Sequence, residues 1–140
     1  MDSGLIAVQA IAVKIAFRRL TAINLKLLED TVEQAVRVPG TSGWDRKAAA
    51  HAEIFNVLAD VTKDPVVAPV LISGVGLSYD LMVAAGRAAD GMITGSRRRM
   101  LAQLRAGAVE EASAEMGNHL RVLHHLWHMA REQRASRSQP

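Results

Sequence analysis

The chain has 140 residues, of which 49% are hydrophobic and 22% charged, and these proportions are typical of one globular domain. It contains no cysteine, which excludes disulfide frameworks, thiolate metal clusters and cysteine nucleophiles. Seventeen Lys and Arg outnumber fourteen Asp and Glu, but the excess lies in residues 94–140, where eight Arg face four Glu. Part of that excess belongs to a Ser- and Gln-containing end, so it does not predict a DNA-binding surface.

The first two predicted elements are helices. Apolar residues at helical spacing predict a helix from about Gly4 to Arg18 and Arg19, whose cations suit a helix C-terminus. Thr21 is suited to cap a second helix that ends near Val38. The predicted apolar stripe of this second helix contains Ile23, Leu27, Leu28, Val32 and Ala35.

Residues 39–43, with the sequence PGTSG, are the strongest loop signal in the chain, and they precede a third helix predicted over 45–62. Asp64 followed by Pro65 is typical of a new helix start, because Asp caps helices and Pro is tolerated at the first helical position. This fourth helix is expected to run to about Ala89.

Asp90 and Gly91 mark the next predicted boundary, after which a fifth helix spans about 94–105 and a sixth about 109–134. Short joints between six helices predict an all-α, single-domain antiparallel bundle. The predicted domain covers residues 1–134, and residues 135–140 are expected to form a flexible tail.

Two apolar stretches invite a membrane interpretation. Leu5–Ala16 lacks a basic flank and contains Lys14, so it does not fit a signal peptide. Pro65–Tyr79 is too short to span a bilayer and contains two Pro and two Gly. We therefore expect a soluble, cytoplasmic protein without a membrane partner.

Histidines are the obvious candidates for chemistry, and four of the five lie in the last predicted helix, at His119, His124, His125 and His128. The second and fourth of these lie one turn apart and could share a metal, although a polar or partner-facing stripe is the simpler interpretation. His51 lies one turn before Phe55 and should point near the core. Hydrolase nucleophile motifs, metalloprotease motifs and phosphate-binding loops are missing, so no enzyme is expected.

Three segments together resemble one known family. They are DRKAAAHAEIFNVLADVTKDPVV at 45–67, RRRMLAQLRAG at 97–107 and MGNHL at 116–120. They resemble the FCD domain, the C-terminal effector domain of FadR-type GntR transcriptional regulators, over nearly the whole chain. The resemblance implies a helical bundle that dimerises and relays effector binding to a winged helix-turn-helix.

The same resemblance implies a divalent metal site of one Asp and three His beside a pocket for small carboxylates. His51 and His119 match two of these ligands, but Lys47 stands at the Asp position and Arg97 at the second His position. Two cations would repel a divalent ion such as Zn or Ni, so no cofactor is expected. Asp45 cannot substitute, because two residues along a helix are about 200° apart around its axis.

Our leading hypothesis is that the cations replace the metal. Lys47 as a point charge and Arg97 as a bidentate fork would hold the effector's carboxylate, with hydrogen bonds from His51 and His119. The alternative is that Lys47 and Arg97 turn outward and the interior is merely packed. A register slip of one residue would transfer the role of Arg97 to Arg98.

The sequence thus predicts an effector-binding and dimerisation domain of a GntR/FadR-type regulator that senses a small carboxylate. It would contact DNA only through a domain absent from these residues, because the first helix begins at about Gly4. A larger effector with an acyl chain is an alternative to the small carboxylate. Two other functions remain: a metal-binding bundle using His51 and His119 with His124 or His128, and a ligand-free helical oligomerisation module.

Overall fold

A computed structural model of the chain describes residues 3–137, which form six α-helices and two short 3₁₀ turns with no strand among them. The predicted all-α bundle is confirmed. The elements are α1 (Ser3–Arg18), α2 (Ala22–Arg37), η1 (Gly40–Ser42), α3 (Trp44–Thr62), α4 (Val67–Ala85), η2 (Arg87–Ala89), α5 (Asp90–Arg105) and α6 (Val109–Arg137).

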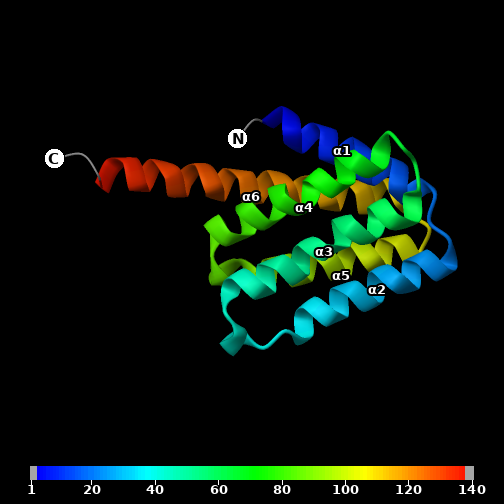
Figure 1. The fold of residues 1–140 in the computed structure, drawn as a ribbon, viewed down its shortest axis with the longest axis horizontal. Coiled ribbons are helices and arrows are strands. Elements are labelled where there is room, and N and C mark those ends of the chain that lie inside the picture. The colour runs from blue at the N-terminus through cyan, green and yellow to red at the C-terminus, as the bar shows by residue number, and fades with distance from the viewer. Residues whose placement is uncertain (1–2, 138–140) are drawn as a thin grey trace.

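The bundle has α3 near its centre, packed between α2 and α4 (Figure 1). Helix α5 contacts α2 and α6, and α1 crosses α6 and α4. The C-terminal part of α6 extends past the other helices (Figure 1). Helices α1, α2 and α4 therefore pack directly on α3, and α5 and α6 complete the bundle through their contacts with the other helices.

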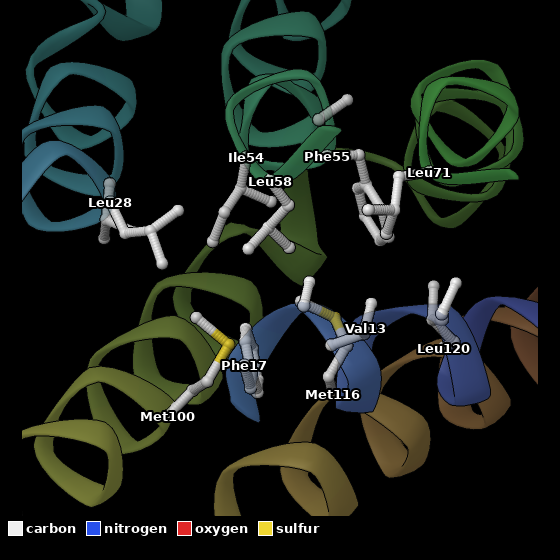
Figure 2. Packing of buried hydrophobic residues seen from close by; sticks show 14 of the residues in the cluster. Val13, Phe17, Leu28, Ile54, Phe55, Leu58, Leu71, Met100, Met116 and Leu120 are labelled. Atoms are coloured by element: carbon white, nitrogen blue, oxygen red, sulfur yellow. The ribbon is translucent and has the colours of Figure 1, made fainter. Parts of the chain in front are cut away.

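The apolar core draws residues from every α-helix (Figure 2). Val13, Phe55, Leu71 and Leu120 are each fully buried, at 0% exposure. Gly74 permits a close approach here, since an added Cβ would lie 2.7 Å from the Phe55 ring and would also collide with Gln9. Small residues are thus needed where α4 crosses α1 and α3.

Helix α2 begins as predicted, because the Thr21 side chain accepts a hydrogen bond from the backbone N–H of Asn24 at 3.1 Å and the Asn24 side chain accepts one from the backbone N–H of Thr21 at 3.2 Å. The predicted stripe is correct for its C-terminal half. Ile23 and Leu27, however, are 78% and 46% exposed, because the inward face of α2 contains Leu25 and Leu28, and Ile23 and Leu27 are rotated away from it around the helix axis.

The junction between α4 and α5 differs from the prediction. Helix α4 ends at Ala85 rather than near Ala89, because Gly86 takes a positive φ of 84° that breaks the helix. Helix α5 then starts at Asp90 rather than at Thr94, with the acidic side chain in its first turn. The pair read as a boundary is thus the beginning of a helix.

Helix α6 also runs longer than predicted and ends at Arg137, since nothing in its sequence stops it at 134. Residues 135–137 of the expected tail are therefore helical. The rest of that tail, residues 138–140, lies outside the described residues, as do residues 1–2.

Helix α4 is the most apolar element. Its 19 residues have a mean hydropathy of 1.6, which by length and composition alone would let it cross a membrane, and 33% of that window is buried in the bundle. The expectation that this stretch is too short to span does not hold, because the helix continues six residues past Tyr79 to Ala85. A single such helix is also found in soluble proteins, and a soluble protein is compatible with this fold.

Candidate functional site

The structure brings the four predicted site residues into one interior region. His51, Arg97 and His119 are only 3%, 2% and 3% exposed, and the Lys47 side chain is 13% exposed. Lys47 and Arg97 do not turn outward, so this part of the alternative is wrong, whereas the interior around His51 and Arg97 is packed, as its other part expected. Of the two neighbouring arginines, Arg97 is the one that faces inward, since the Arg98 side chain is 54% exposed and pairs with Glu33 on the surface.

Helix geometry places these side chains inward. Lys47 and His51 lie one turn apart on α3, so both face α5. Arg97 shares its face of α5 with Ile93 and Met100, which are fully buried. The periodic apolar pattern that directs α5 into the core thus carries a guanidinium with it.

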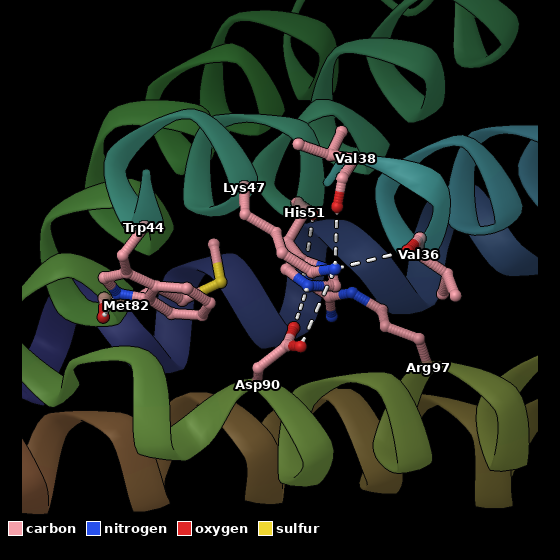
Figure 3. A network of polar contacts seen from close by, with 8 residues as sticks. All are labelled: Val36, Val38, Trp44, Lys47, His51, Met82, Asp90 and Arg97. Carbon is pink, nitrogen blue, oxygen red and sulfur yellow. Dashed lines mark hydrogen bonds and ion pairs between the residues drawn. The ribbon is translucent and has the colours of Figure 1, made fainter. Parts of the chain in front are cut away.

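Asp90 is the member of the site that the sequence reasoning missed. Its carboxylate lies 2.9 Å from His51 Nε2 and 3.7 Å from Lys47 Nζ (Figure 3). Asp90 and Arg97 are seven residues apart on α5, which puts them on the same helix face two turns from each other. That spacing was visible in the sequence, but the Asp-Gly pair was interpreted as a helix boundary.

The ammonium of Lys47 is held at the end of α2. It donates hydrogen bonds to the carbonyl oxygens of Val36 at 3.2 Å and Val38 at 3.0 Å (Figure 3). Carbonyls at a helix C-terminus carry partial negative charge, so this is a favourable place for a cation. Trp44 closes the neighbouring side, because its indole N–H donates to the Met82 carbonyl at 2.8 Å.

Arg97 is a buried cation without a carboxylate partner among the described residues. Its guanidinium donates to the His51 carbonyl at 3.4 Å and to the Met116 sulfur at 3.1 Å, and it lies 5.9 Å from the centre of the Phe55 ring. Its Nε has no hydrogen-bond partner. Burial lowers the pKa of Arg97 to about 10, so the group still carries its charge at neutral pH.

The two buried histidines are neutral at pH 7. Burial lowers the pKa of His119 well below its usual value, and the charge of Arg97 and then His51 lower it further. The pKa of His51 is also lowered, mainly by burial, although the hydrogen bond with Asp90 opposes that effect. Neither ring nitrogen of His119 has a hydrogen-bond partner, which is unusual for a buried imidazole.

The interior charges do not balance. Lys47 and Arg97 contribute two positive charges against the single negative charge of Asp90, which leaves one positive charge uncompensated. A void of about 160 Å³ between α2 and α3 reaches Arg97 and His51, but it is too narrow for a water molecule. An anion can therefore enter this region only if side chains around the void move. The remaining lining residues are Thr31, Val32, Ala35, Ala50 and Ile54.

The donor set does not fit a divalent metal. Within residues 3–137 no three His, Asp or Glu side chains come close enough to share an ion. His51 and Asp90 form a pair, but among the described residues no third His, Asp or Glu lies close enough to complete a ligand set with them, and His119 does not join His124 or His128 in one. The last two rings lie 4.5 Å apart on the C-terminal half of α6, next to Trp127.

Comparisons of the chain with models of known protein families, with curated proteins and with solved structures found no match. The likeness to the FCD domain accordingly rests on the three sequence segments alone.

Proposed function

We propose that this chain is the effector-binding and dimerisation domain of a GntR/FadR-type transcriptional regulator, which senses a small carboxylate in the bundle interior. Lys47, His51, Arg97 and His119 would hold the effector, and a domain outside these residues would contact DNA. One observation carries the proposal: Arg97 is buried without a counter-ion beside His119, whose ring nitrogens have no partner.

The physical argument starts from the cost of such an arrangement. A buried charge without a partner and a buried imidazole without hydrogen bonds both destabilise a fold. A carboxylate supplies what is missing, since it accepts two N–H groups of a guanidinium and one from a neutral imidazole. It would also neutralise the single excess positive charge of the region.

The placement of these groups suits a relay. His51 lies on α3, Arg97 on α5 and His119 on α6, so one bound anion would draw three helices together. A ligand that favours one packing of these helices shifts their equilibrium toward it. A dimer would transmit that shift to attached DNA-binding domains.

The test is a carboxylate screen by thermal unfolding at constant ionic strength. The panel runs from acetate and pyruvate to succinate and citrate, with octanoate for a larger acyl effector and acetamide as the uncharged match for acetate. We expect at least one carboxylate to raise the Tm of the wild-type chain, whereas acetamide leaves it unchanged. Arg97→Met should abolish the response, and the exposed-site control Arg98→Met should retain it.

Two results would contradict the proposal. One is a panel in which no carboxylate changes the Tm. The other is a response that Arg97→Met and Arg98→Met reduce equally, because that would indicate binding to the general basic surface rather than to the interior.

A ligand-free oligomerisation module is the second candidate, and a separate observation favours it. Several large apolar side chains on α1 and α4 are exposed. They are Leu5, Val8 and Ile11 on α1 and Ile72 and Val83 on α4. Burial of such residues against a second copy would stabilise a dimer. Both candidates predict a dimer by analytical ultracentrifugation, so the carboxylate response is what separates them.

A further inference from the structure

We infer that Asp90 is a built-in competitor of the effector: its carboxylate occupies the outer part of the cationic site, and an incoming carboxylate must displace it to bind. This inference rests on the proposed function, and it adds a residue that sets the affinity of the site. The position of Asp90 between the proposed ligand groups and the surface carries the inference.

Asp90 already makes the contacts that an effector would need. Its Oδ1 lies 2.9 Å from His51 Nε2 and its Oδ2 lies 3.7 Å from Lys47 Nζ (Figure 3). These are two of the four groups proposed to hold the ligand. A carboxylate in solution therefore competes for them with one that is tethered to the same chain and has a high effective concentration.

The tethered carboxylate covers only half of the site. Arg97, two turns further along α5, forms no ion pair with a carboxylate, and the ring nitrogens of His119 on α6 have no hydrogen-bond partner among the described residues. The inner groups thus still attract an anion while Asp90 occupies the outer ones. An effector that reaches Arg97 gains an ion pair that Asp90 does not make, and this difference would drive the exchange.

The local structure lets Asp90 move away. Its side chain is 33% exposed, so water can replace the contacts with Lys47 and His51 when they are lost. Asp90 is also the first residue of α5, directly after η2 and close to Gly86 with its positive φ. A movement of Asp90 at the start of α5 does not require a break inside the helix. Effector binding would consequently release the α4–α5 junction, which gives the occupied state a distinct shape.

The experiment compares Asp90→Asn with wild type and with Asp60→Asn, which removes the same charge from an exposed position on α3. Acetate and succinate are titrated into each protein by isothermal calorimetry at constant ionic strength. We expect Asp90→Asn to bind at least one of them about tenfold more tightly than wild type, because a second uncompensated positive charge then faces the ligand. Asp60→Asn should bind like wild type.

A second measurement uses the wild-type chain alone and so does not depend on the folding of a variant. In NMR spectra of protein labelled with ¹⁵N-histidine and ¹³C-aspartate, the His51 ring and the Asp90 carboxylate signals should both move as acetate or succinate is added. The Asp60 signal should stay in place. Movement of the His119 ring signals alone, with the His51 and Asp90 signals unchanged, would overturn the inference.

The outcomes separate this inference from the proposed function. If the wild-type chain binds a carboxylate and Asp90→Asn binds it with equal or lower affinity, the competitor role of Asp90 is wrong. The proposed anion site is still supported in that case. Binding by Asp90→Asn but not by wild type supports the competitor role of Asp90, but it counts against carboxylate sensing by the wild-type chain. Absence of binding to either protein overturns the anion site, and the competitor role with it.

Discussion

The interior of this bundle has two regions that differ in how well their groups are matched. Around Val13, Phe55 and Leu71, apolar side chains from α1, α3 and α4 are fully buried against one another. Next to this region, Arg97 and His119 are also buried, at 2% and 3% exposure, but among the described residues three of their nitrogen atoms have no hydrogen-bond partner. The first region has the properties of a core selected for stability, whereas the second contains the unmatched polar groups on which the proposed effector site rests.

The contact between Phe55 and Arg97 marks the boundary. The guanidinium lies 5.9 Å from the ring centre, so the aromatic face provides part of the stabilisation that a carboxylate would otherwise supply. On the other side, the Arg97 N–H groups reach only a backbone carbonyl and a thioether sulfur. These are weak acceptors compared with a carboxylate. Burial alone therefore does not distinguish the two regions, whereas the number of polar atoms without a hydrogen-bond partner does.

The largest effect should come from the matched region. Phe55→Ala removes a fully buried ring and leaves a cavity, so we expect a loss of about 3–5 kcal/mol in the free energy of unfolding. Chemical denaturation measures it. A loss below about 1 kcal/mol, which is typical of surface positions, would show that this region is not tightly packed.

The mismatched region should respond in the opposite direction. Arg97→Met replaces an unpaired buried cation by an apolar side chain of similar length, and we expect the free energy of unfolding to rise by about 1–3 kcal/mol. The matched control is Arg98→Met at an exposed position, which should change it by less than about 0.5 kcal/mol. A clear destabilisation by Arg97→Met would mean that the guanidinium is satisfied as it stands.

The pH dependence of stability should also originate in the mismatched region. The pKa of His119 is lowered in the folded state from its usual value of 6.5. Below pH 6.5 the unfolded chain therefore binds a proton at His119 more readily than the folded chain does. Stability is therefore full above pH 6.5 and falls as the pH decreases toward the folded pKa, by up to about 1.4 kcal/mol per pH unit for this group. His119→Gln should reduce that slope between pH 6.5 and 5. An unchanged slope would place the titration elsewhere.

The smallest expected effect concerns Trp44, at the outer edge of the site. Trp44→Phe keeps most of the apolar contact but loses the hydrogen bond to the Met82 carbonyl, so a loss of about 0.5–1.5 kcal/mol is expected. Thermal unfolding measures it, and Trp127→Phe on the partly exposed part of α6 is the control. Equal losses from the two substitutions would argue against a role for Trp44 in closing the site.

Much of the architecture could be predicted from the sequence, because local rules operate there. The 3.6-residue spacing of apolar groups predicts all six helices, and Thr21 predicts the start of α2 through its side-chain cap. The prediction failed at the α4–α5 junction. There, a positive φ at Gly86 ended α4 early, and Asp90 became part of a helix instead of a boundary.

The candidate site shows the same division. Helical spacing and the resemblance together predicted that Lys47, His51, Arg97 and His119 share one interior region, and the structure confirms their burial. The sequence did not reveal that Asp90 joins them, because the contact between His51 and Asp90 spans 39 residues and depends on how α3 packs against α5. Nor did it reveal that Arg97 has no carboxylate beside it.

The sequence by itself thus determined the six helices and the all-α architecture, since these follow from residue type and local periodicity. The tertiary structure decided which charges are paired. Electrostatic interactions act through space between residues far apart in the chain. Only the packing of the helices could therefore show that the Asp90 carboxylate lies beside His51 and Lys47, whereas Arg97 has no carboxylate partner among the described residues.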